Sequence, residues 1–235
     1  YNLSLSGKLS NTRYRVSLTH QTNPGVVIGS GREGSGVTLS LAQKALNNKL
    51  DVRLNGSFAS FESTILPSYG AESQFKNLFY QAFKRNTTDP VYNDQGDYYQ
   101  SMRDFAYYNP MAILGYTSNV VTTSYVNIGV GASYRISNHL LANATFGYSN
   151  NNTERNYVQE PEAFDRVGDV SYTDVEQNGI KTNLNLCVSY SKAVFSNSNI
   201  DVSLGFSNRV YSSEMNRDDS GSEKEGGDEF LDVKT

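Results

Sequence analysis

The sequence contains very few of the residues that build disulfide frameworks, metal sites and nucleic-acid interfaces. Cys187 is the single cysteine among 235 residues, so no intramolecular disulfide can form. His20 and His139 are the only imidazoles available for metal binding or proton transfer. Lysine and arginine number 20 against 24 aspartates and glutamates, which is not the basic surplus typical of nucleic-acid binders. These shortages argue against disulfide scaffolds, zinc sites and nucleic-acid partners.

Long hydrophobic runs are also absent. No stretch approaches the roughly 20 consecutive apolar residues of a membrane-spanning helix, which excludes a helical membrane protein. The first residues, YNLSLSG, lack the pattern of a signal peptide, so we expect any targeting signal to lie outside this sequence. Hydrophobic residues make up 37% and charged residues 19%, whereas 19 glycines, 17 tyrosines and 11 phenylalanines are present. This composition favours strands and turns over helices.

Eight segments alternate apolar and polar residues with a period of two, as strands with two unlike faces do. They are residues 1–7, 13–22, 37–42, 50–61, 126–136, 140–148, 180–190 and 200–206. All five prolines lie between these segments, as expected if every backbone N–H of a strand is needed for pairing. The pattern therefore predicts eight strands that share one apolar face.

The connections between these segments alternate between short and long. Outer-membrane barrels have short periplasmic turns, long extracellular loops and strands with one lipid-facing and one lumen-facing side. The alternative is a soluble β-sandwich, in which the apolar face would be the core. Because the polar positions hold mainly Ser, Asn, Thr and Gly, they favour a water-filled lumen. We predict an all-β fold, an antiparallel transmembrane β-barrel of which about eight strands are present.

A long insert, residues 62–122, separates the fourth and fifth segments, and we expect it to be an extracellular loop containing a short helix. The helical stripe comprises Phe75, Leu78, Phe79, Ala82 and Phe83. Ser73 is the expected N-cap, and the stripe is expected to pack on neighbouring loops. Residues 212–235 are acidic and rich in glycine and serine, which predicts a flexible loop.

Tyrosine and aspartate recur after the expected helix, in TDPVYND, GDYYQS and DFAYYNPMA. Aromatic rings with hydrogen-bonding edges suit carbohydrate or peptide ligands. The candidate substrate-binding residues are Tyr92, Tyr98, Tyr99 and Asn109. We predict no metal site and no cofactor; calcium in the loops would be conceivable, but no EF-hand spacing supports it.

Two features resemble known functional sites, but the residues around them do not support a nucleotide site or a catalytic cysteine. GSGREG, with Gly29, Gly31 and Gly34, fits a dinucleotide fingerprint, but the following GVTLSLA predicts a strand instead of the required helix. We interpret the motif as a loop between strands. Cys187 falls on a polar strand face with no catalytic signature around it. An outer-membrane hydrolase would need a nucleophile, a base and an orienting group, and no pattern predicts them, so we expect no enzyme.

Several segments in the first half resemble the barrel of the SusC/RagA class of TonB-dependent outer-membrane transporters. They begin with YNLSLSGKLSNTRYRVSLTHQTNPGVVIGS and LSLAQKALNNKLDVRLNGSF, and continue with FYQAFKRNTTDPVYN and YYNPMAILG. The elements DPVY at residues 89–92 and NPMA at residues 109–112 occur in the order and spacing of that family. The second half resembles it mainly by its strand pattern.

The resemblance implies energy-coupled import of oligosaccharides or peptides across the outer membrane of a Bacteroidetes-type bacterium. It implies a SusD-like surface lipoprotein and the TonB complex as partners, with outer-membrane lipid around the barrel. Family members have a plug domain inside about 22 strands, so residues 1–235 are expected to be an interior piece of one barrel domain, without the plug, the TonB-contacting region or the remaining strands. The alternative is a small closed eight-stranded barrel with a structural or adhesion role.

Overall fold

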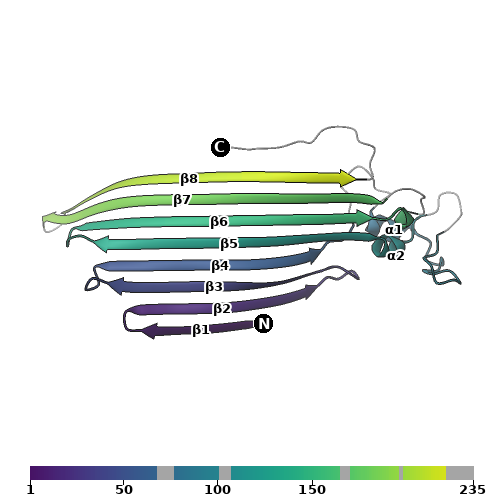
Figure 1. Ribbon diagram of the computed structural model, residues 1–235, viewed down its shortest axis with the longest axis horizontal. Helices are drawn as coiled ribbons and strands as arrows, with labels where there is room; N and C mark the ends of the chain where they lie inside the picture. Colours follow the sequence, from purple (N-terminus) through teal and green to yellow (C-terminus); the bar gives the residue numbers. More distant parts are fainter. Residues whose placement is uncertain (68–76, 101–106, 165–169, 196–197, 221–235) are drawn as a thin grey trace.

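The chain folds into one wide antiparallel sheet with small helices gathered at one end (Figure 1). The computed structural model describes residues 1–67, 77–100, 107–164, 170–195 and 198–220. No helix in these ranges has the length and apolar character needed to cross a membrane.

The sheet contains eight strands that pair in the order of the sequence, each antiparallel to the next. They are β1 (Asn2–Leu9), β2 (Thr12–Pro24), β3 (Gly31–Ala45), β4 (Leu50–Thr64), β5 (Thr117–Arg135), β6 (Leu140–Gln159), β7 (Ser171–Phe195) and β8 (Ser198–Ser220). Each of the eight alternating segments coincides with one of these strands, and only the end residues Tyr1 and Ile136 lie just outside. The predicted all-β antiparallel fold is confirmed.

Short and long connections occupy opposite ends of the sheet. Turns of two to four residues join β1 to β2, β3 to β4 and β5 to β6. The second of these turns has Leu46, Asn47 and Asn48 in the left-handed region, which asparagine tolerates better than most residues. Residues 25–30, 65–116 and 160–170 make the longer connections at the other end. The predicted alternation is therefore present.

Two strands extend into segments that were expected to be loops. β3 begins at Gly31, so most of the GSGREG motif belongs to a strand and the loop interpretation was wrong for it. β8 continues to Ser220, so residues 212–220 are strand, and residues 221–235 lie outside the described residues. These extensions lack apolar alternation, but each pairs residue by residue with a neighbouring strand. Backbone hydrogen bonding maintains them where the hydrophobic pattern ends.

Three short helices pack together at the long-loop end (Figure 1). They are α1 (Leu78–Lys84), α2 (Pro110–Gly115) and the 3₁₀-helix η2 (Pro161–Phe164). We call these helices, with residues 77–100, 107–116 and 160–164, the loop cluster. Its core consists of Leu78, Ile113, Ala163 and Phe164. Most of the fully buried residues lie in this cluster or in the adjoining ends of β5 and β6.

The predicted helix is present but starts later and faces differently than expected. Its N-cap is Asn77, whose Oδ1 accepts hydrogen bonds from Phe79 N and Tyr80 N. The expected cap, Ser73, and Phe75 lie outside the described residues. The stripe does not pack as predicted: Leu78 is buried, but Phe83 is 85% exposed.

The sheet itself has no core within the described residues. Its apolar side chains, such as Leu54, Val130, Phe146 and Leu184, lie on one face with no second sheet against them. The β-sandwich alternative is therefore wrong. The small closed barrel is not formed either, because β1 and β8 are opposite edges of the sheet. No pairing between β1 and β8 joins these edges in the described part of the chain.

Candidate functional site

The two faces of the sheet differ in chemistry. We call the face that carries Leu54, Val130 and Leu184 the apolar face, and the opposite one, which carries Asn55 and Asn183, the polar face. Paired residues share a face in an antiparallel sheet, so the register assigns every strand residue to one of the two. The polar face is cross-linked by side-chain hydrogen bonds, including Ser133 Oγ to Asn143 Oδ1 at 2.6 Å.

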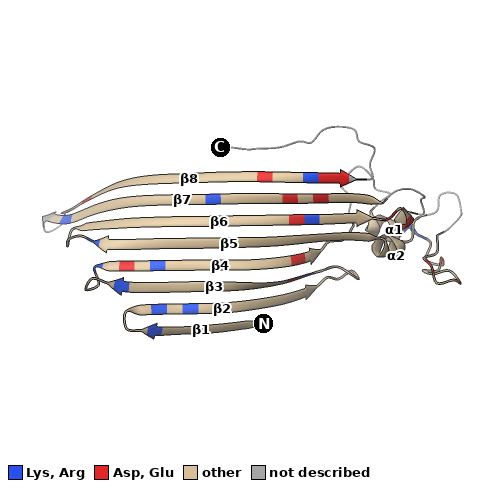
Figure 2. Ribbon diagram, viewed as in Figure 1, with Lys and Arg blue, Asp and Glu red and all other residues tan. Residues whose placement is uncertain are grey.

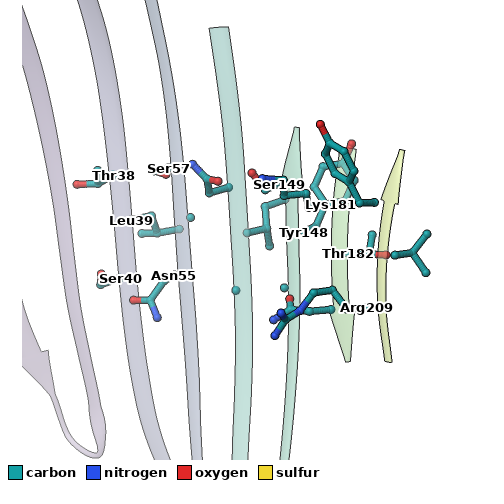
Figure 3. Close-up of a pocket in the computed structure, with 18 residues that line it drawn as sticks. Thr38, Leu39, Ser40, Asn55, Ser57, Tyr148, Ser149, Lys181, Thr182 and Arg209 are labelled. Atoms are coloured by element: carbon teal, nitrogen blue, oxygen red, sulfur yellow. Dashed lines mark hydrogen bonds between the residues drawn. The ribbon is translucent and has the colours of Figure 1, made fainter. Parts of the chain in front are cut away.

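A groove of about 800 Å³ crosses the middle of the polar face from β3 to β8 (Figure 3). Two neighbouring rows of polar-face residues line it. The first row is Thr38, Ser57, Asn127, Ser149, Lys181 and Tyr211. The second row is Ser40, Asn55, Gly129, Gly147, Asn183 and Arg209. The groove thus offers amides and hydroxyls along most of its length and two cations near β7 and β8.

The two faces also differ in charge. The lysines and arginines of the strands lie on the polar face with the single exception of Lys192. The polar-face cations are Lys8, Arg13, Arg15, Arg32, Lys44, Arg53, Arg135, Arg155, Lys181, Arg209 and Arg217. Three acids, Asp51, Asp201 and Asp219, share that face. The polar face is therefore strongly basic.

The remaining acidic strand residues lie on the apolar face. They are Glu33, Glu62, Glu154, Asp174, Glu176, Glu214 and Asp218. All of them lie toward the long-loop end, beyond the rows of Leu, Val and Phe, and Figure 2 shows acidic positions gathered there on β4, β6, β7 and β8. No group of three or more His, Cys, Asp or Glu side chains in the described ranges could hold a metal ion. The prediction that the protein uses no metal and no cofactor stays untested.

Asn109, one of the four candidate binding residues, sits inside the loop cluster. It is 1% exposed and caps α2, with its Oδ1 accepting a hydrogen bond from Met111 N at 3.0 Å. Its Nδ2 donates to Val91 O at 2.8 Å and Tyr99 O at 3.1 Å. Because its amide groups are engaged with protein, Asn109 has no exposed group for a ligand and instead positions the tyrosine segment.

Arg85 holds the same segment from the end of α1. Its guanidinium donates to Tyr99 O at 2.9 Å, and to Pro90 O and Tyr107 O at 3.3 Å each. Burial among these loops lowers the pKa of Arg85, while Asp89 and Tyr99 act in the opposite direction. The group stays charged at neutral pH. Sequence reasoning missed this role of Arg85, because its carbonyl partners lie up to 22 residues away in the sequence.

The three candidate tyrosines lie on a small hairpin supported by Arg85 and Asn109. Tyr92 and Tyr98 form an isolated antiparallel bridge, and their rings stack with centroids 5.4 Å apart. The ring of Tyr98 also meets Tyr116 edge-on at 5.3 Å. Tyr92 is 52% exposed, whereas Tyr98 and Tyr99 are partly buried. The structure brings the three close together, and ligand binding by them stays a prediction.

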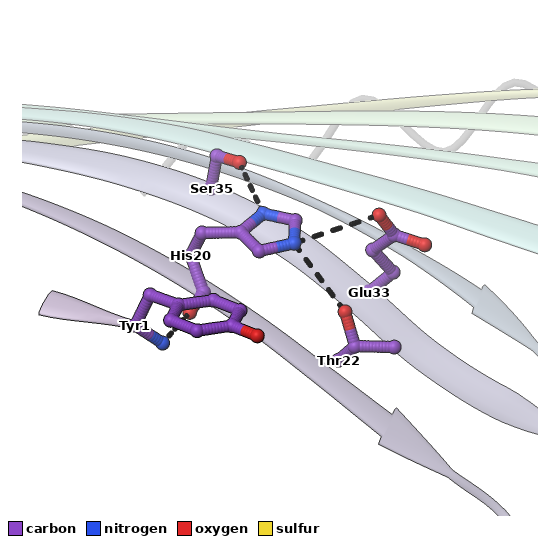
Figure 4. Close-up of polar contacts among 5 residues, drawn as sticks. All are labelled: Tyr1, His20, Thr22, Glu33 and Ser35. Carbon is purple, nitrogen blue, oxygen red and sulfur yellow. Dashed lines mark hydrogen bonds and ion pairs between the residues drawn. The ribbon is translucent and has the colours of Figure 1, made fainter.

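A second polar cluster surrounds His20 on the apolar face (Figure 4). His20 Nδ1 lies 3.0 Å from Ser35 Oγ, and its Nε2 lies 3.7 Å from Glu33 Oε1. The N-terminal amine of Tyr1 donates to His20 O at 2.6 Å. Sequence reasoning did not anticipate this Ser, His and Glu arrangement, because the residues come together only through the register of β2 and β3.

The His20 cluster does not have the geometry of a hydrolase site. Acyl transfer needs free hydrogen-bond donors aimed at the developing oxyanion. Ser35 lies in an interior strand whose backbone groups are used by the ladders with β2 and β4. Thr22 Oγ1, at 3.3 Å, competes with Glu33 for the same ring nitrogen. The arrangement is better explained as a link between the first three strands.

The fold is similar to solved structures of the RagAB peptide importer. The chain matches its closed-closed state with a TM-score of 0.73 at 15% identity, over 93% of this chain and 25% of that one. A second RagAB structure matches with a TM-score of 0.71 at 15% identity, over 95% of this chain and 25% of that one. The open-open state matches with a TM-score of 0.68 at 15% identity, over 99% and 27% of the two chains.

The predicted resemblance to the SusC/RagA class is confirmed at the level of the fold. The chain spans about a quarter of the length of the importer chains it matches. No protein-family model matches the sequence, and no curated protein matches it. The matched structures are those of a peptide importer, and the similarity of this chain to them is a similarity of fold.

Proposed function

We propose that this chain forms part of the barrel wall of a TonB-dependent importer in a bacterial outer membrane, of the SusC-like, Bacteroidetes type. The observation that carries the proposal is the eight-stranded sheet, whose apolar face has none of the described residues of the chain packed on it as a second layer and whose opposite face is polar. In water such a face would promote aggregation, whereas in an outer-membrane barrel it contacts lipid. The similarity to the RagAB peptide importer supports the same conclusion.

The dimensions of the apolar face suit a bilayer. On β7 its apolar residues run from Ile180 to Tyr190. Ten residue steps correspond to about 34 Å along a strand, and a tilt of about 40° reduces the height to about 26 Å, close to the apolar band of outer-membrane barrels. Glu176 and Asp174 lie beyond this band toward the long loops. The charged end would therefore lie outside the membrane, with the loop cluster facing the cell exterior.

The proposed cargo is an oligosaccharide or a peptide, and no covalent chemistry or cofactor is expected. The tyrosine hairpin is the proposed contact at the extracellular end, with Tyr92, Tyr98 and Tyr99 as ligand-facing residues. A SusD-like lipoprotein is the proposed surface partner, because the matched structures are RagAB complexes. Energy would come from the TonB complex through a region of the full protein outside this chain.

Cargo uptake by intact cells tests the proposal. Cells that carry the full-length protein should accumulate labelled oligopeptides or oligosaccharides, and deletion of its gene should abolish this uptake. Removal of TonB should abolish it as well, because transport through a plugged barrel needs energy. Undiminished uptake without TonB would contradict energy coupling, and undiminished uptake without the gene would contradict import by this protein.

Alanine substitutions test the proposed contact. Tyr92→Ala and Tyr98→Ala should weaken cargo binding to the purified full-length protein without changing its assembly into membranes, because each removes a stacking ring. Tyr190→Ala, on the apolar face, is the matched control and should leave affinity unchanged. Affinity unchanged in all three variants would remove the hairpin from the binding site.

A further inference from the structure

The charge on the polar face is largely uncompensated. Within the described residues, its only ion pairs between side chains are Arg53 with Asp51 at 3.0 Å and Arg217 with Asp219 at 2.6 Å. Lys181 and Arg209 have no carboxylate at ion-pair distance in that part of the chain, and both line the groove. The ammonium of Lys181 lies 5.1 Å from the centre of the Tyr211 ring, a contact that does not neutralise its charge.

The groove has room for an occupant at these two cations. Gly129 and Gly147 lie side by side on its floor. No atom comes within 4 Å of where a Cβ of Gly129 would be, whereas the side chain of Asn183 lies over Gly147. Arg209 points from β8 toward the middle of the groove (Figure 3). Asn55 and Asn183 add amides that can donate hydrogen bonds. Cations surrounded by amide donors form a site that complements carboxylates.

The cations are also distributed along the whole face. Lys8 and Arg13 lie near the short turns, Lys181 and Arg209 in the middle, and Arg32 near the long loops. The chain as a whole has a formal charge of −4, so the basic face results from placement of the charges and not from their sum. A path lined by one sign of charge concentrates ligands of the opposite sign.

We propose that the groove on the polar face binds anionic cargo, namely peptides rich in aspartate and glutamate or oligosaccharides that carry carboxylates, through Lys181 and Arg209. This inference rests on the proposed import function and narrows its substrate class. An acidic segment of the same transporter could instead neutralise these cations, and the experiment distinguishes the two occupants.

The test measures binding of matched probes to the purified full-length protein in lipid nanodiscs. One pair consists of oligopeptides of equal length that contain either glutamate or glutamine. The other consists of oligogalacturonate and its neutral methyl ester. The acidic member of at least one pair should bind at least about tenfold more tightly at low salt, and this preference should shrink in about 0.5 M salt. Equal affinity of the charged and neutral members at low salt would overturn the inference.

The double variant Lys181→Gln/Arg209→Gln assigns the preference to the groove. It should lower affinity for the acidic probe about tenfold and leave the neutral probe unchanged. Lys192→Gln, on the apolar face, is the matched control and should change neither. An undiminished acidic preference in the double variant would overturn the assignment. A lower melting temperature with unchanged affinity would show that an acidic part of the transporter itself occupies the groove.

Failure of all four probes to bind, together with absence of uptake by cells, would overturn the proposed function and this inference with it. Binding of the neutral members alone would overturn only the anionic class. The two failures are therefore distinguishable.

Discussion

The loop cluster buries its apolar side chains, whereas the sheet leaves most of its apolar side chains uncovered. In the loop cluster, Leu78, Ile113 and Phe164 are buried against one another, as in a small globular domain. In the sheet, Leu54 and Leu184 lie on a face with no protein packed on it in the described part of the chain. Under the proposed function this difference reflects two solvents: the cluster folds in water, and the apolar face meets lipid.

The same contrast applies to polar groups. The sheet satisfies its backbone through regular ladders, and its register follows from the alternation of the two faces. The loop cluster satisfies its irregular backbone through single buried side chains, above all Asn109 and Arg85. A substitution in the sheet should therefore have only a local effect if the new side chain suits the face on which it lies. A substitution in the loop cluster should disturb a whole segment.

The largest expected effect comes from placing a charge in the apolar rows. Leu54→Arg should lower the free energy of unfolding by about 2 to 4 kcal/mol, because the cation would face hydrocarbon. Asn55→Arg, the next residue along β4 but on the polar face, should cost little. Urea titration of the full-length protein in lipid vesicles, followed by the mobility of the folded band, measures both. Equal costs at the two positions would contradict the assignment of the faces.

Removal of the Asn109 amide tests whether its hydrogen bonds stabilise the loop cluster. Asn109→Ala should reduce local stability by about 2 to 4 kcal/mol, since it removes a helix cap and two buried donors. Hydrogen exchange should accelerate at residues 91–99 and at Met111, while the strands stay protected. Asn86→Ala, which loses one exposed hydrogen bond to Thr88 N, is the control and should change little. Unchanged exchange in the first variant would mean that the hairpin is held by other contacts.

A pair of glycines on the polar face sharpens the comparison within the sheet. A Cβ at Gly34 would meet the ring of Phe61 and, at 2.5 Å, the backbone oxygen of Ser60, whereas at Gly129 it would meet nothing within 4 Å. Gly34→Ala should therefore cost about 1 to 3 kcal/mol through overpacking, and Gly129→Ala should cost far less. The same urea titration compares the two variants. Similar losses in the free energy of unfolding would show that β3 and β4 move apart easily at Gly34.

The smallest effect is expected at the His20 cluster. The side chains of His20 and Glu33 are 41% and 64% exposed, so their ion pair is screened by water. Glu33→Gln should change stability by less than about 1 kcal/mol. Cargo uptake should also be unaffected, because the cluster lies on the face opposite the groove. A loss of uptake at normal expression would show that the cluster has a function beyond linking strands.

The strands could be predicted from the sequence because apolar and polar residues alternate between Leu50 and Phe61 and in the other seven segments, and the register places the apolar ones on one face. The polar ends of β7 and β8 could not, since Glu214 to Ser220 has no apolar alternation and is held by pairing alone. The even number of strands also left the small closed barrel open as an alternative, and only the observed pairing shows that β1 and β8 are separate edges.

The site was predictable only in part. The tyrosines were found by composition, and the structure does bring Tyr92 and Tyr98 together. Asn109 was predicted to line the substrate cavity, and the structure shows it buried as a helix cap; an asparagine followed by Pro110 at the first helical position is a recognised helix start. The groove escaped detection because its rows join six strands, and their register becomes visible only in the folded sheet.

The central claim is that the apolar face contacts lipid and the polar face lines the interior. Site-directed spin labelling of the full-length protein in vesicles tests it directly. One label at a time is placed at residues 184–188 of β7, and Cys187 is replaced by serine in the variants labelled at the other four positions. Accessibility to oxygen in the lipid should peak at 184, 186 and 188, and accessibility to a water-soluble nickel reagent at 185 and 187. Accessibility without a period of two, or with the opposite phase, would contradict the account.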